Sequence, residues 1–92
     1  MSTVFEPTQA EERWLACRVD QGMFSDELAV TYPATGTWQK SVFVDRSAVR
    51  GEIGDVGQVR VALLRKGGSI IAVLPSPERD IVYVDPGDIR EE

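Results

Sequence analysis

The hydrophobic pattern of the chain is the feature that most constrains its fold. Apolar residues, rich in Val, Ile and aromatics, alternate with polar residues at a period near two. Glycine or proline interrupts this alternation about every 8 to 12 residues. A period of two is typical of half-buried β-strands, because successive side chains of a strand point to opposite faces. The sequence therefore predicts an all-β domain.

Six strands are expected from this alternation. They span residues 14–19, 27–32, 38–45, 59–65, 69–74 and 81–84. The segment Lys66-Gly67-Gly68 predicts a tight hairpin between the fourth and fifth strands, since glycine supplies the positive φ angles that primed turns require. Residues 46–57 are expected to form a loop with one short helical turn at 47–50.

A chain of 92 residues with 42% hydrophobic residues corresponds to one small globular domain. A domain of this size has little room for an enclosed ligand cavity, so a surface site is expected. We expect residues 11–92 to form a single small antiparallel barrel of five or six strands, SH3-like or OB-like in general form, because closure removes exposed sheet edges. Residues 1–10 are expected to be a mobile acidic tail.

Two segments of the chain resemble each other. Residues 42–49 and 82–89 share the pattern Val-aromatic-Val-Asp followed by a branched aliphatic residue. One explanation is that residues 16–49 and 61–89 are equivalent three-stranded halves, which would pack about a pseudo-twofold axis. The other is chance recurrence in a chain rich in valine.

Residue types that several common chemistries require are missing. The chain has no histidine and one cysteine, which excludes Ser–His–Asp and Cys–His catalysis as well as zinc and iron–sulfur sites. Cys17 shares a strand face with Leu15 and Val19 and is expected to be a small buried hydrophobe. The glycines of residues 51–57 are not followed by Lys-Ser/Thr and do not form a nucleotide loop. We therefore expect a protein that is not an enzyme and has no catalytic residue, metal or cofactor.

Two aspartates occupy matching places in the two similar segments. Asp45 and Asp85 either approach one another across the pseudo-twofold axis or cap the turns that follow them. Capping is the simpler interpretation, because an aspartate carboxylate readily accepts bonds from backbone N–H groups in turns.

The negative charge is concentrated at the ends of the chain. The formal net charge is −5, but residues 1–12 and 85–92 together carry −6, and residues 13–84 carry +1. An acidic start is the reverse of a secretory signal, and no apolar run approaches the roughly 20 residues of a transmembrane helix. A soluble, cytoplasmic protein without membrane contact is expected.

The candidate binding surface consists of an aromatic residue accompanied by basic residues, the usual composition of an interface hot spot. It comprises Trp38, Lys40, Arg46, Arg50 and Arg65. Trp38 is equally compatible with the core, which is expected to take Trp14, Trp38 and at least two more of the seven aromatic residues. The resulting prediction is a non-catalytic module that binds a protein partner and is itself a monomer or a weak homodimer.

Binding of single-stranded nucleic acid is the alternative. Small barrels bind single strands by stacking bases on aromatic side chains beside a basic groove, and Phe43 and Tyr83 accompany Trp38 in the chain. The acidic net charge disfavours this alternative, because typical nucleic-acid binders are strongly basic.

Overall fold

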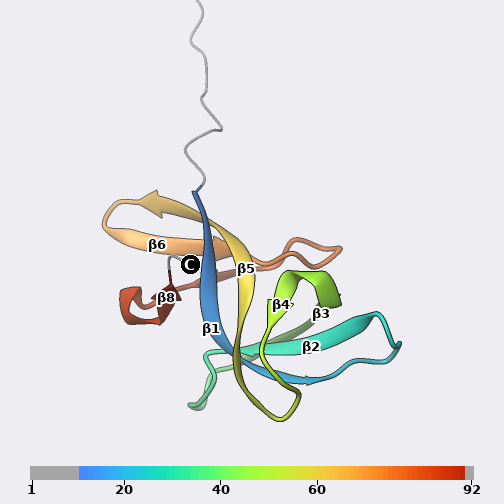
Figure 1. Cartoon of the computed structure of the whole chain (residues 1–92). Helices are drawn as coiled ribbons and strands as arrows, with labels where there is room; N and C mark the ends of the chain where they lie inside the picture. The colour runs from blue at the N-terminus through green and yellow to red at the C-terminus, as the bar shows by residue number, and fades with distance from the viewer. Residues whose placement is uncertain (1–10, 91–92) are drawn as a thin grey trace, which may run out of the picture.

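The structure, a computed structural model, describes residues 11–90. The predicted tail of residues 1–10 lies outside the described residues. In chain order the elements are β1 (Glu11–Gln21), β2 (Glu27–Tyr32), β3 (Lys40–Asp45), the 3-10 helix η2 (Arg46–Ala48), β4 (Val49–Arg50), β5 (Asp55–Lys66), β6 (Ser69–Val73), β7 (Ile81–Tyr83), the 3-10 helix η3 (Pro86–Asp88) and β8 (Ile89–Arg90). The prediction of an all-β fold is confirmed, since six of these strands form an antiparallel sheet that is nearly closed into a barrel (Figure 1).

All six predicted strands are present, with differences at their ends. The strands β1 and β5 begin earlier than predicted, at Glu11 and Asp55, and the two-residue strands β4 and β8 were not predicted. The prediction that Trp38 belongs to the third strand is wrong, because β3 begins at Lys40. The preceding residues form a turn that the Gln39 side chain holds by donating to the carbonyl oxygens of the turn's first residues, at 3.1 and 3.2 Å.

The two longest strands, β1 and β5, form the centre of the sheet. Its order is β3-β2-β1-β5-β6-β7, and every pairing is antiparallel. The β1–β5 ladder runs from Glu11 opposite Leu63 to Val19 opposite Asp55. Alternate residues of the two strands face inward and are almost completely buried, as their alternation predicts. These inward residues are Leu15, Cys17, Val19, Val59, Val61 and Leu63.

The short strands β4 and β8 extend the pairing of the central strands. Val59 of β5 pairs with Leu15 on one side and with Val49 of β4 on the other. In the same row, Leu15 of β1 likewise pairs on its other side with Ile89 of β8. Each central strand therefore pairs with a short strand along the part of its outer edge that its hairpin partner does not cover. β8 pairs with β1 beyond β2, and β4 pairs with β5 beyond β6.

This pairing has an internal pseudo-twofold symmetry. The elements β1-β2-β3-η2-β4 and β5-β6-β7-η3-β8 repeat in the same order, and each half ends by pairing with the first strand of the other. Leu15 pairs directly with its equivalent, Val59, so the axis passes through that pair. According to the pairing registers, equivalent residues of β1 and β5 are 44 positions apart in the sequence. The separation is 42 positions for β2 and β6 and 40 positions for β3 and β7. The similarity between residues 42–49 and 82–89 thus corresponds to equivalent structure.

The matching aspartates cap the two 3-10 helices. Asp45 Oδ1 accepts from the backbone N–H of Ser47 at 3.0 Å, and Asp85 Oδ1 accepts from the N–H of Gly87 at 2.9 Å. The capping interpretation is confirmed. The bonds from the Ser47 N–H and then from its hydroxyl hold the pKa of Asp45 below its usual value, because they stabilise the charged carboxylate.

Side chains bridge the gap between the edge strands β3 and β7. Lys40 Nζ lies 3.2 Å from Asp80 Oδ1, in the segment that leads into β7. Tyr32, at the end of β2, donates its hydroxyl proton to Asp88 Oδ2 at 2.7 Å and accepts from the N–H of Asp85 at 3.0 Å. These contacts connect the two halves where no strand ladder does.

The core is filled mainly by branched aliphatic side chains, and the aromatic residues contribute less than predicted. Among the described aromatic residues only Trp14 and Tyr32 are buried, so the expectation that four would fill the core is wrong. Trp38 is 91% exposed because it lies in a turn. Trp14 lies outside the main core cluster, and the guanidinium of Arg50 covers its ring at 3.9 Å from the centroid.

Candidate protein-binding surface

The outer face of the second half is apolar across three strands. Ala62, Val73 and Ile81 form one row of cross-strand neighbours. Leu64, Ile71 and Tyr83 form the next row. Tyr83 is 74% exposed and Ile81 57% exposed. We call the surface made by these two rows the apolar face.

The first half provides a matched comparison for the apolar face. Its two equivalent rows lie on the outer side of β1, β2 and β3. Four of the six residues are polar or charged, one is a small alanine and one is aromatic. The rows are Arg18, Thr31 and Ser41, then Asp20, Ala29 and Phe43.

The fold is compatible with polar residues on its outer face. Both halves have the same strand order and register. At three equivalent positions the first half has Arg18, Asp20 and Ser41, and the second half has Ala62, Leu64 and Ile81. The architecture therefore does not require apolar residues on its outer face. A contiguous exposed apolar patch on a small domain is a common mark of an interaction surface.

A second feature, the aromatic hollow, adjoins the apolar face. It has a volume of about 410 Å³. Trp38 and Tyr83 line it together with Lys40, and Tyr83 also belongs to the apolar face. Its remaining lining residues are Tyr32, Pro33, Gln39 and Val82. The two features thus form one continuous surface that reaches from the turn before β3 across β7 to β5.

The structure brings together two of the five predicted site residues. Trp38 and Lys40 both line the aromatic hollow, whereas Arg46, Arg50 and Arg65 do not. Arg46 donates from Nε to the carbonyl oxygen of the residue before Asp26, at 3.0 Å.

The other two arginines have partners elsewhere. Arg50 stacks on Trp14 and donates from Nη2 to Gln58 Oε1 at 2.7 Å. Arg65 Nη2 lies 3.4 Å from Glu11 Oε1. These basic side chains are dispersed, so they do not form one groove with Trp38.

The sequence analysis did not include three large apolar residues of this surface, Leu64, Ile71 and Ile81, and named Tyr83 only for the nucleic-acid alternative. All four lie on strands that are apolar at successive positions, so both faces of those strands are apolar. In an antiparallel sheet with one solvated face, alternation is the rule and a continuous apolar run is the exception. The continuous apolar runs in these strands were therefore the sequence signal that could have indicated the apolar face.

The lone thiol is buried in the core. Cys17 is fully buried, which confirms its predicted place in the core, and burial raises the pKa of its thiol to about 12. A thiol with such a pKa stays protonated at neutral pH and is a poor nucleophile. Within residues 11–90 there is also no group of three or more Cys, Asp and Glu side chains placed to hold a metal ion.

Comparisons with protein-family models, with curated proteins and with solved structures found no match for this chain. In the part of the chain that the structure describes, no helix is long and apolar enough to cross a membrane. The functional assignment therefore depends on the geometry of the surface itself.

Proposed function

We propose that this protein is a non-catalytic binding module whose ligand is a protein, and that the partner docks on the apolar face and the aromatic hollow. The observation that carries the proposal is the difference between the halves. Equivalent, solvent-facing positions are apolar in one half and mostly polar in the other.

The composition of the surface supports a protein partner. Interfaces have an apolar, aromatic-rich centre from which charges are depleted and a rim that is polar. The six residues of the apolar face carry no charge, and Arg65, Lys66 and Asp80 flank them in the chain. Trp38 and Tyr83 are large, exposed aromatic side chains of the kind that dominate binding energies. A partner complementary to this surface presents an apolar patch with side chains that fill the aromatic hollow.

Site-specific photo-crosslinking tests the proposal. A benzophenone amino acid replaces Ile81 in one variant and its equivalent, Ser41, in the other, in cells that produce the protein. We expect protein adducts from position 81 and none from position 41, because both positions are exposed but only the first lies on the apolar face. Equal adducts from both positions, or none from either, would refute docking at this face.

A matched double variant adds a second test. Leu64→Asp with Ile81→Ser gives the apolar face the residues that Asp20 and Ser41 supply in the first half. We expect the adducts of a probe placed at Tyr83 to disappear while the melting temperature changes little. Persistence of the adducts in a folded variant would contradict the proposal.

Single-stranded nucleic acid is the second candidate ligand, and one observation favours it. Lys40 lies in the same hollow as Trp38 and Tyr83, so a cation accompanies two exposed rings on which bases could stack. An amide-shift titration with a mixed-sequence oligonucleotide at about 50 mM and about 200 mM salt tests this candidate. Saturable shifts at the hollow that fade with salt would support it, and no shifts at the lower salt would eliminate it.

A further inference from the structure

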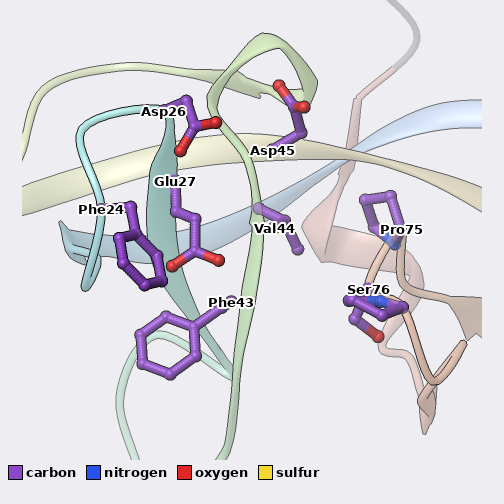
Figure 2. Close-up of a pocket in the computed structure, with 9 residues that line it drawn as sticks. Phe24, Asp26, Glu27, Phe43, Val44, Asp45, Pro75 and Ser76 are labelled. Atoms are coloured by element: carbon purple, nitrogen blue, oxygen red, sulfur yellow. The ribbon is translucent and has the colours of Figure 1, made fainter.

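A second concave surface lies between the first half and the loop that joins β6 to β7, and it shares no residue with the apolar face. It has a volume of about 590 Å³, and we call it the acidic pocket. Its nine lining residues include two exposed rings, Phe24 and Phe43, and three carboxylates, Asp26, Glu27 and Asp45, but no basic residue. The loop at Pro75 and Ser76 forms the opposite wall (Figure 2).

The carboxylate of Glu27 lies at the centre of this arrangement. Figure 2 shows it directed toward the space beside the rings of Phe24 and Phe43. Its Oε1 atom is buried and accepts no hydrogen bond from any described residue. A covered carboxylate oxygen without a partner is costly, because burial removes water and nothing replaces it.

The neighbour of Glu27 across the ladder adds to this cost. Glu27 of β2 stands directly opposite Asp45 of β3, on the same outer face. Like charges directly opposite one another destabilise a sheet. Arg46, which follows Asp45 in the chain, donates from Nε to the Ser25 carbonyl oxygen and does not line the pocket.

The pseudo-twofold equivalent of this pocket shows that the fold does not require Asp26 and Glu27. The equivalent surface on the second half is smaller, about 230 Å³, and Gly68 and Ser69 line it where the acidic pocket has Asp26 and Glu27. The aromatic residue is kept, as Tyr83 in place of Phe43. The charges of Asp26 and Glu27 are therefore specific to the first half, whereas Asp45 has an acidic equivalent in Asp85.

We infer that the acidic pocket binds the guanidinium group of an arginine side chain presented by a protein partner. A guanidinium is planar, stacks on aromatic faces and pairs with carboxylates, which are the two kinds of group that Phe24, Phe43 and Glu27 bring together. Bound there, it neutralises the carboxylate of Glu27, whereas the carboxylate of Asp45 points away from the rings and accepts hydrogen bonds from Ser47. The inference deepens the proposed function by naming a chemical requirement of the partner, at a site separate from the apolar face.

An amide-shift titration with short peptides tests the inference directly. The probe is a blocked Gly-Gly-Arg-Gly-Gly peptide, and its control contains citrulline, which has nearly the same shape and no charge. We expect saturable shifts at Phe24, Glu27 and Phe43 with the arginine peptide and none with the citrulline peptide. Equal shifts with both peptides, or no saturable shift with arginine at low salt, would overturn the inference.

Three substitutions localise the interaction. Glu27→Ser installs the residue found at the equivalent Ser69 and should weaken binding about tenfold or more, since it removes a charged partner. Phe24→Ser, at an exposed loop residue, should weaken it about two- to fivefold by removing one ring. Glu52→Ser makes the same charge change at an exposed residue outside the pocket and should leave affinity unchanged. Unchanged binding in folded Glu27→Ser would contradict the inference.

The peptide titration and the crosslinking experiment test the two proposals independently. The peptide titration reports on the acidic pocket alone, whereas crosslinking from position 81 reports on the apolar face. Crosslinks at the apolar face without arginine binding would refute this inference and leave the proposed function in place.

Discussion

Replacing Tyr32 with phenylalanine removes the hydrogen bonds that join the two halves at the open side of the barrel. The hydroxyl donates to Asp88 Oδ2 at 2.7 Å and accepts from the Asp85 N–H at 3.0 Å, and the ring itself is buried. A hydrogen bond to a charged group contributes about 1.5–3 kcal/mol. Phenylalanine keeps the ring and its packing, so we expect Tyr32→Phe to lower the free energy of unfolding at pH 7 by about that amount.

The same residue predicts how this difference changes with pH. Burial is the largest cause that raises the pKa of Tyr32, from 10.0 to about 12, and the proximity of Asp88 adds to it. Above pH 10 the unfolded chain releases the phenol proton while the folded protein still retains it. The contribution of the protonated Tyr32 hydroxyl to the free energy of unfolding is therefore complete below pH 10 and is lost as the pH rises toward 12. The full loss corresponds to about 2.7 kcal/mol.

Urea denaturation of the wild type and of Tyr32→Phe, from pH 7 to pH 11, measures both effects. We expect the difference in free energy of unfolding to be largest at pH 7 and to shrink above pH 10. Tyr83→Phe is the matched control, because Tyr83 is exposed and its hydroxyl bonds to no described residue. A difference at pH 7 below about 0.5 kcal/mol, within the range of ordinary surface substitutions, would refute the reasoning.

Three further predictions concern other parts of the fold. Gly57→Ala should destabilise the protein by about 1–3 kcal/mol in urea denaturation, because the added Cβ would clash with the Arg50 carbonyl oxygen and lie 2.9 Å from a Val19 methyl group. The control, Gly87→Ala, should destabilise it much less, because the nearest atom to the added Cβ is 3.5 Å away. Cys17 should react with a thiol reagent at the rate of unfolding at pH 8, and rapid reaction of the folded protein would show that the thiol is not buried. Arg50→Ala should uncover the ring beneath it and shift tryptophan fluorescence to longer wavelength, and an unchanged spectrum would contradict the stacking.

The local part of the fold could be predicted from the sequence. The inward faces of β1 and β5 follow from alternation, and the hairpin at Gly67 and Gly68 follows from turn chemistry, because both depend on neighbours in the chain. The strands β4 and β8 could not be predicted, since two residues carry no periodicity. They exist because each meets a central strand that is distant in sequence.

The candidate surface was predictable only in part. The presence of Trp38 and Lys40 in one place follows from their closeness in the chain. Their proximity to Tyr83 depends on how the edges of the sheet meet, which no local pattern records. Arg50 and Arg65 lie apart from Trp38 and Lys40, because Arg50 stacks on Trp14 and Arg65 pairs with Glu11, two residues of β1 that are distant in sequence.

The spacing between equivalent residues has a consequence for how this fold can change. The separation falls from 44 to 42 to 40 along the two halves, so the connections differ in length by an even number at each step. Because the inward and outward faces of each strand are set by its pairing register, these differences in connection length leave the later side chains on the same faces. Insertions and deletions in these turns should therefore be accepted as long as the strand ladders keep their register. The loops that carry Phe24 and Trp38 can thus be lengthened or shortened to suit another ligand while Val44 and Val84 remain inside.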